Sequence, residues 1–179
     1  MKNVNKNLKF HMDMERYENK PSLYVKILLL LYRKYFVCNS LMLKLTIKSI
    51  FRLLSQSRGL EIGLENEIGG GLYLGHVYNI TINPAVKIGS NCNLHKGLVI
   101  GQENRGSRKG VPTIGNSVWI GINAAIVGNI TVGDDVLIAP NSYVNRDIPS
   151  HSIVFGNPCV IKPCENATEC YVHNKVTIE

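Results

Sequence analysis

Two histidines in the middle of the chain, His76 and His95, are the residues best suited to acid–base chemistry. Imidazole titrates close to neutral pH, so a histidine can take the proton from a hydroxyl that is otherwise a poor nucleophile. A carboxylate that holds the other ring nitrogen stabilises the imidazolium that forms, and Glu61 precedes both histidines. The alternatives are a surface histidine at 76, a polar residue beside a loop at 95 and a solvated charge at 61.

An aliphatic residue at every sixth position dominates the sequence from residue 62 to residue 144. This period fits neither an amphipathic helix nor a hairpin sheet. It is typical of a β-helix, in which each repeat gives a short strand and a turn built with Gly, Asn or Asp. We therefore predict a mainly β fold whose inward residues are Ile62, Ile68, Leu74, Ile80, Val86, Cys92, Leu98, Ile114, Ile120, Ile126, Val132, Ile138 and Val144. The register breaks once, and the polar, glycine-rich residues 102–111 are predicted to form an extruded loop.

Apolar residues at helical spacing predict two helices upstream of the repeats, separated by a turn at residues 38–40. We expect these helices to cover the open end of the β-helix, where core and strand edges would otherwise be exposed. The chain is thus divided into a helical region at 1–56, a β-helix at 57–163 and a tail at 164–179.

The net charge of +7 is concentrated in the first third of the chain. Residues 1–60 carry twelve Lys or Arg against three Asp or Glu, a net +9, and the remainder carries eight against ten, a net −2. This basic region is predicted to be a solvated or inter-subunit surface, with peripheral contact to an anionic membrane as the alternative. Because it has no recognisable recognition helix or aromatic stacking motif, no nucleic-acid partner is expected.

Targeting signals and cysteine chemistry are not indicated by the sequence. The longest apolar run, residues 27–32, is far shorter than the roughly twenty residues that span a bilayer. The first twenty residues lack the pattern of a secretory signal, so we expect a cytoplasmic location, which includes the inner face of the membrane. Five cysteines without CxxC spacing support neither a disulfide framework nor a zinc site, and Cys159, Cys164 and Cys170 are expected to be free thiols.

The sixfold repeat, the extruded loop, the segment 71–76 and the closing segment 153–158 together resemble the serine acetyltransferases and their sugar-acetylating relatives. The resemblance runs from about residue 60 to residue 162. It implies a left-handed parallel β-helix, a homotrimer, and an acetyl-CoA-dependent O-acetyltransferase that uses acetyl-CoA as co-substrate and requires no metal. In this family a histidine deprotonates the acceptor hydroxyl and a carboxylate one coil earlier orients it. The resemblance places His76 and Glu61 in these two catalytic roles.

The resemblance also indicates positions for the coenzyme and the acceptor. Backbone groups at five positions correspond to the family's pantetheine and adenine contacts: Gly101, Gln102, Ile122, Ala139 and Pro140. Three cations, which are otherwise solvated charges, are candidates for the coenzyme phosphates: Arg108, Lys109 and Lys162. The positions expected to face the acceptor are His95, Gly75, Gly110 and Val111.

The charged acceptor-binding groups of the family are missing from this sequence. The Asp that precedes the catalytic histidine is replaced by Gly75, and an Arg-His pair beside the loop is replaced by Gly110 and Val111. A zwitterionic amino acid requires a carboxylate for its ammonium group and a guanidinium for its carboxylate. We therefore expect a sugar hydroxyl of a surface polysaccharide as the acceptor. The alternatives are serine O-acetylation in cysteine biosynthesis and, in another functional class, a non-catalytic β-helix scaffold.

Overall fold

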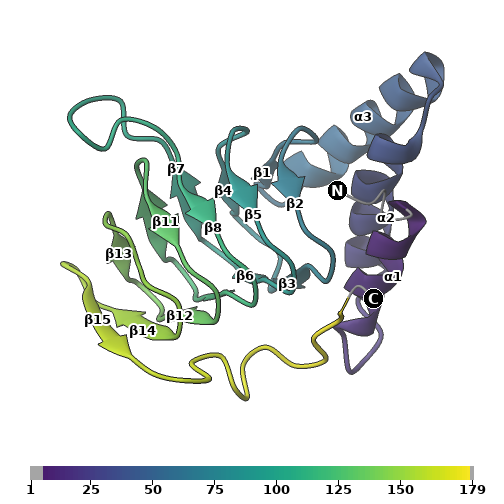
Figure 1. Ribbon diagram of the computed structural model, residues 1–179. Coiled ribbons are helices and arrows are strands. Elements are labelled where there is room, and N and C mark those ends of the chain that lie inside the picture. Colours follow the sequence, from purple (N-terminus) through teal and green to yellow (C-terminus); the bar gives the residue numbers. More distant parts are fainter. Residues whose placement is uncertain (1–5, 178–179) are drawn as a thin grey trace.

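The structure is a computed structural model that describes residues 6–177, and it consists of three helices followed by a parallel β-helix (Figure 1). The outermost residues of the two predicted terminal segments, 1–5 and 178–179, lie outside the described residues. The helices are α1 (Lys6–Glu15), α2 (Leu23–Val37) and α3 (Leu41–Gln56).

Helices α2 and α3 are the two that the apolar spacing predicts. Ser22 and Ser40 are their N-caps, and each hydroxyl accepts a hydrogen bond from the backbone N–H three residues later. The turn between them lies at residues 38–40, as predicted. Helix α1 is not predicted, because its sequence is largely polar and lacks an apolar stripe. It is held by tertiary contacts, with Met12 and Asp13 buried.

The strands form three sheets, one on each side of the coil. Sheet A contains β1 (Glu61–Ile62), β4 (Thr81–Ile82), β7 (Val99–Gly101), β10 (Ala125–Val127) and β13 (Tyr143–Val144). Sheet B contains β2 (Glu67–Ile68), β5 (Lys87–Ile88), β8 (Thr113–Ile114) and β11 (Thr131–Val132). Sheet C contains β3 (Tyr73–Gly75), β6 (Asn93–His95), β9 (Trp119–Ile120), β12 (Val136–Ile138), β14 (Ser152–Phe155) and β15 (Val160–Pro163). Among the described residues, neighbouring strands pair in parallel except β14 with β15, which are antiparallel.

The interior of the β-helix is the apolar column that the repeat predicts. All thirteen predicted inward residues are buried. The stacking partner of Ile62 is Ile82, however, and that of Ile82 is Ile100, each two residues beyond the predicted Ile80 and Leu98. The six-residue register therefore shifts by two residues between β3 and β4, in addition to the predicted break at the loop. Asn and Asp occupy corners with positive φ, for example Asn91 and Asp135, as expected from turn chemistry.

The glycines that follow the aliphatic residues have a different role from the one predicted. Gly69 does not have a positive φ, but a Cβ at this position would lie 2.6 Å from the backbone of Gly89 in the next coil. Close approach of neighbouring coils therefore requires glycine here.

The helices cover the open end of the first coil, as predicted, and their side chains bond its free backbone groups. The Asp13 carboxylate accepts a hydrogen bond from Leu72 N at 2.8 Å, and the Tyr17 hydroxyl accepts one from Leu74 N at 2.9 Å. Arg33 donates to the carbonyls of Ile68 and Gly69 at 2.8 and 2.6 Å. These contacts satisfy a strand edge that would otherwise be open.

The segment between β7 and β8 leaves the coil, as predicted (Figure 1). Glu103 and Gly110 close it through two backbone hydrogen bonds of 3.0 Å, and residues 104–109 between them are exposed. Such a loop on a rigid scaffold is suited to contacting a ligand or a second chain.

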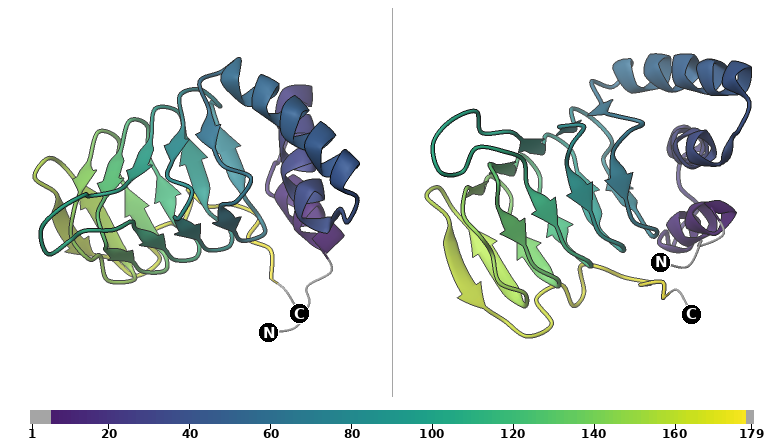
Figure 2. Two further views of the ribbon diagram at one scale, coloured as in Figure 1. Left: turned by 90° about the horizontal axis from the view of Figure 1, so that it is seen from above. Right: turned by 45° about the horizontal axis from the view of Figure 1, so that its top comes forward.

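The tail that follows β15 runs back along sheet C to the helices, which Figures 1 and 2 show in yellow. The carboxylate of Asp135 accepts hydrogen bonds from the backbone N–H groups of Ala167 and Thr168 at 3.0 and 3.1 Å. Farther along, Asn91 and Val176 form two hydrogen bonds of 3.0 Å. The tail is therefore fixed to the outer face of sheet C at several points.

Within the described residues, no helix is long and apolar enough to cross a membrane. All five cysteines are free thiols, as expected for the group near the C-terminus.

Candidate active site

His76 is exposed at the edge of the β-helix between sheets C and A. It follows β3 directly, and its φ of 51° turns the chain toward β4. The strand register places Gly75 opposite His95, Leu94 opposite Ile120, and Ile120 opposite Ile138. When this register is extended by one or two residues past the strand ends, three of the predicted coenzyme positions lie at the same edge as His76: Ile122, Ala139 and Pro140.

Glu61 lies on the neighbouring face, in sheet A, where it is exposed beside Thr81. It lines a hollow of about 470 Å³ together with Gly101, one of the predicted coenzyme positions. Gln102 follows at the rim, and the Asn83 amide lies 3.5 Å from the Gln102 side-chain oxygen. Across residues 6–177, no hydrogen bond joins Glu61 to His76. The catalytic pairing of these two residues stays a prediction.

His95 is held in one orientation and one tautomer. Its Nδ1 lies 2.9 Å from the carbonyl oxygen of Ile120, so Nδ1 carries the hydrogen and Nε2 keeps a lone pair. Burial lowers the pKa of His95 below its ordinary value, and the nearby His76 lowers it further, against the hydrogen bond to Ile120. His95 is therefore a neutral imidazole beside His76, able to accept a hydrogen bond.

The His95 ring lies directly against Gly75. A Cβ at residue 75 would be 2.5 Å from His95 Cδ2 and 2.7 Å from Nε2, so no side chain fits there in this arrangement. An acceptor-binding carboxylate at residue 75 is thus excluded by packing as well as by sequence. The two predicted acceptor-facing positions are in contact, and His95 fills the space beside Gly75.

A second hollow, of about 270 Å³, lies on sheet C beside His95. Its walls come from the end of α1, from sheet C and from the tail, which contribute residues including Tyr17, Tyr73, Trp119 and Tyr171. The Trp119 ring centroid lies 4.7 Å from that of His95 and 5.2 Å from that of Tyr171, so Trp119 packs between these two rings.

Sequence reasoning missed this second hollow. Side chains alternate along β3 and β6, so Tyr73 and His95 point outward while Leu74 and Leu94 point inward. This alternation could have indicated from the sequence that Tyr73 and His95 share an outer face. No local sequence pattern indicated that the tail would form one wall of this hollow.

The loop cations and the two loop acceptor positions lie apart from both hollows in this single chain. The Arg108 guanidinium pairs with Glu103 at 3.2 Å, and Lys109 is exposed. A Cβ on Gly110, which has a φ of 138°, would meet Asn129, and Val111 packs against the core. Lys162 is exposed on β15, opposite Ile153. None of these positions lines the hollows that contain Glu61 or His95.

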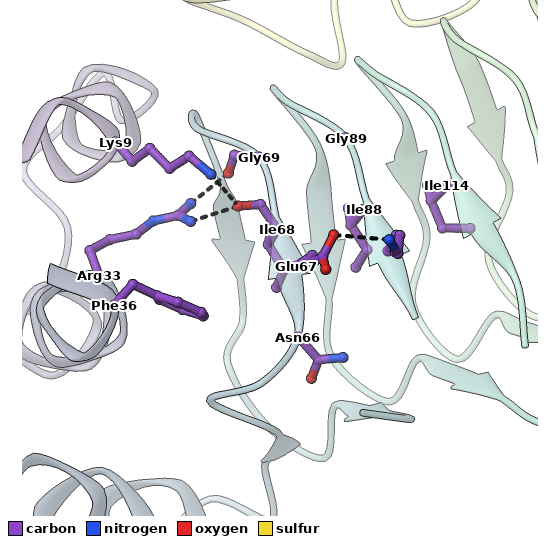
Figure 3. Close-up of a pocket in the computed structure, with 11 residues that line it drawn as sticks. Lys9, Arg33, Phe36, Asn66, Glu67, Ile68, Gly69, Ile88, Gly89 and Ile114 are labelled. Carbon is purple, nitrogen blue, oxygen red and sulfur yellow. Dashed lines mark hydrogen bonds and ion pairs between the residues drawn. The ribbon is translucent and has the colours of Figure 1, made fainter. Parts of the chain in front are cut away.

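The largest of these hollows, about 480 Å³, lies between the helices and sheet B (Figure 3). Its charged groups are already bonded: Arg33 to Asp13 at 2.8 Å, Lys87 to Glu67 at 3.2 Å, and Lys9 to the Ile68 carbonyl at 3.3 Å. None of the predicted site residues lines it.

Comparison with known proteins shows what this β-helix of six-residue repeats is similar to. Residues 112–146 match the model of the bacterial transferase hexapeptide (six repeats) family. The chain is 34% identical to the serine acetyltransferase of Synechococcus elongatus over 100 residues, which cover 56% of this chain and 41% of the relative. It is 35% identical to that of Helicobacter pylori over 99 residues, which cover 55% of this chain and 58% of the relative.

The chain therefore spans about half the length of the curated relatives it matches. Among solved structures, it is similar to the serine acetyltransferase of Neisseria gonorrhoeae, with a TM-score of 0.70 and 24% identity over 91% of this chain and 70% of that one. The soybean enzyme gives a TM-score of 0.73 at 20% identity over 88% and 69%. These two likenesses show the fold. Together, the comparisons confirm the resemblance to serine acetyltransferase-like hexapeptide acyltransferases.

Proposed function

We propose that this chain is an acyltransferase, an acetyl-CoA-dependent O-acetyltransferase in which His76 is the general base. The observation that carries the proposal is an exposed His76 at the edge of a hexapeptide β-helix, in a chain similar to serine acetyltransferases over 100 residues. A buried histidine at this position would argue for a structural role instead.

In the proposed reaction, His76 takes the proton from the acceptor hydroxyl as its oxygen attacks the thioester carbonyl. The C–S bond then breaks, and the leaving thiolate receives the proton from the imidazolium. General-base catalysis of this kind supplies roughly 10²–10⁴-fold in rate. Glu61, which lies in the strand that begins the same coil, stabilises the imidazolium in this proposal, a role for which a carboxylate is suited.

The coenzyme is proposed to lie along the edge that carries His76. Two observations support this. Ile122 and Pro140 lie in the later coils at the same edge as His76, and Gly101 lines the hollow that also contains Glu61. The phosphate-binding roles of Arg108, Lys109 and Lys162 require a neighbouring subunit, because in one chain these cations lie apart from both hollows. The proposal therefore includes a homotrimer in which two chains complete each site.

For the acceptor, the comparisons favour serine, and hence the cysteine-biosynthesis alternative, over the sugar that the sequence led us to expect first. A sugar hydroxyl remains the second candidate because of one observation. The His95 ring fills the space in which an ammonium-binding carboxylate at residue 75 would lie. A neutral imidazole and the aromatic wall of Tyr73 and Trp119 suit a neutral polyhydroxyl group better than an ammonium group.

The test is thiol release from acetyl-CoA by the full chain, with serine and with a panel of hexoses and amino sugars. His76→Ala is expected to reduce turnover by about 100-fold or more. His11→Ala is the matched control, because His11 is exposed on α1, and it is expected to leave turnover unchanged. Release with serine supports the main acceptor, and release with sugars alone supports the second. No release with any acceptor would favour the non-catalytic scaffold, and equal turnover of the two variants would show that His76 is not the general base.

A further inference from the structure

The outward face of helix α3 is unusually apolar for a helix at the surface of a protein. Only Ile47, Phe51 and Ser55 of this helix are buried. Four large apolar side chains on the opposite side are at least half exposed, namely Leu41 at 70%, Met42 at 76%, Leu45 at 53% and Leu53 at 69%. We call these four residues the α3 apolar face. Figure 2 shows α3 on the outside of the helical region.

These side chains form one stripe, which the exposed Ser49 interrupts between Leu45 and Leu53. Leu41, Leu45 and Leu53 are four and eight residues apart, and Met42 lies three residues before Leu45, so all four project from the same side of the helix. Several large exposed apolar side chains on one side of a helix mark an interaction site more often than single exposed leucines do.

Basic residues flank the stripe, and helices α2 and α3 themselves contain no acidic residue. Glu61 and Glu65 of the first coil line a hollow together with Lys48 and Arg52. Lys48 and Arg52 are exposed at the border of the α3 apolar face. Residues 19–60, which include all of α2 and α3, contain eight Lys or Arg and no Asp or Glu. Lys44 lies over the Tyr35 ring, 5.7 Å from its centroid, so it too stays close to the helix surface.

The charge decides between the candidate occupants. A second copy of this chain that docked through the same helices would bring two acid-free, strongly basic segments together, and like charges repel. A nucleic acid would match the charge but would leave four large apolar side chains in water. An anionic bilayer surface matches both features, because apolar side chains enter the acyl boundary while Lys and Arg reach the headgroups.

We propose that α3 is an interfacial amphipathic helix that docks the β-helix on an anionic membrane surface, with the α3 apolar face buried in the headgroup region. This inference is independent of the proposed acetyl transfer, since it rests on residues remote from His76 in the sequence and on binding alone. It also assigns a role to the basic region that the site does not use.

The test is co-sedimentation of the full chain with vesicles of phosphatidylglycerol and phosphatidylcholine, compared with pure phosphatidylcholine. Binding is expected only to the anionic vesicles, and 0.5 M salt is expected to weaken it, because surface electrostatics are screened. Lys48→Ala/Arg52→Ala is expected to reduce affinity about 25-fold, since each cation near an anionic surface contributes about fivefold. Leu45→Ser/Leu53→Ser is expected to reduce it about tenfold or more, because less apolar area is buried.

Matched controls lie on the β-helix. Lys96→Ala/Arg146→Ala changes the net charge equally at exposed positions, and Val160→Ser changes a side chain that is also 53% exposed. Both are expected to bind vesicles like the wild type, and circular dichroism establishes that each variant is folded.

Three outcomes would overturn the proposal. One is an absence of binding, or equal binding to neutral vesicles. Another is unchanged binding by the leucine variant, which would reduce the effect to charge alone. The third is a lower sedimentation mass of that variant without lipid, which would show that a second copy covers this face.

Discussion

The buried ion pair between Asp13 and Arg33 allows one perturbation to be worked out in detail. The two side chains are 0% and 4% exposed, and they lie 2.8 Å apart. The Asp13 carboxylate also accepts the Leu72 N–H at the edge of the first coil. Asp13→Ala therefore leaves a guanidinium buried without its counter-charge and a backbone donor without an acceptor. Removal of one partner from such a pair costs about 3–5 kcal/mol of unfolding free energy.

For a chain of 179 residues, each kcal/mol shifts the melting temperature by about 2–4 °C. Asp13→Ala is thus expected to melt about 6–20 °C lower, as measured by circular dichroism at one protein concentration. Asp147→Ala is the matched control, because its exposed carboxylate also accepts one backbone N–H, from Thr131 at 2.7 Å, but has no buried partner. About 1 kcal/mol or less is expected there.

Asp13→Ala/Arg33→Met separates the buried charge from the edge contacts. Removal of the uncompensated guanidinium is expected to restore part of the melting temperature. The recovery is expected to be incomplete, because the Gly69 carbonyl loses its Arg33 donor and the Ile68 carbonyl keeps only that of Lys9. If Asp13→Ala melts no lower than Asp147→Ala, the reasoning about the capped edge is wrong.

Further predictions concern sheet C and the tail. Gly75→Asp is expected to destabilise the chain by about 1–3 kcal/mol through overlap with His95, and thermal melts should show that His95→Ala largely relieves this. Asp135→Asn is expected to loosen the tail. The fluorescence of Trp119, the only tryptophan in the sequence, should report this change because Tyr171 of the tail packs on its ring. Burial raises the pKa of Asp135, but the hydrogen bonds it accepts outweigh this and lower it below 3.8, so the wild-type signal should change only below about that pH. Because burial lowers the pKa of His95, its protonation favours the unfolded chain, and stability measured by denaturant titration should fall below pH 6.5, less so in His95→Phe.

The local periodicities were sufficient to predict much of the fold. The sixfold spacing alone identified the β-helix and all thirteen inward residues, because every coil repeats the same apolar requirement. The break in that spacing located the loop, and apolar residues at helical spacing located α2 and α3. The prediction of His76 as the base came from a motif resemblance, and its catalytic role and the division of the chain into three regions remain predictions.

Only the tertiary structure decided how distant segments meet. Helix α1 carries a polar sequence, and it is ordered by Asp13 and Arg16, which bond the edge of a coil formed more than fifty residues later. The contact of His95 with Gly75 depends on coil stacking, which sets residues twenty apart side by side. The tail became one wall of the hollow beside His95 through hydrogen bonds that join residues far apart in the chain, such as Asn93 with Tyr171. A periodic pattern reports which side of its own element a residue faces, and it contains no information about which remote segment covers that side.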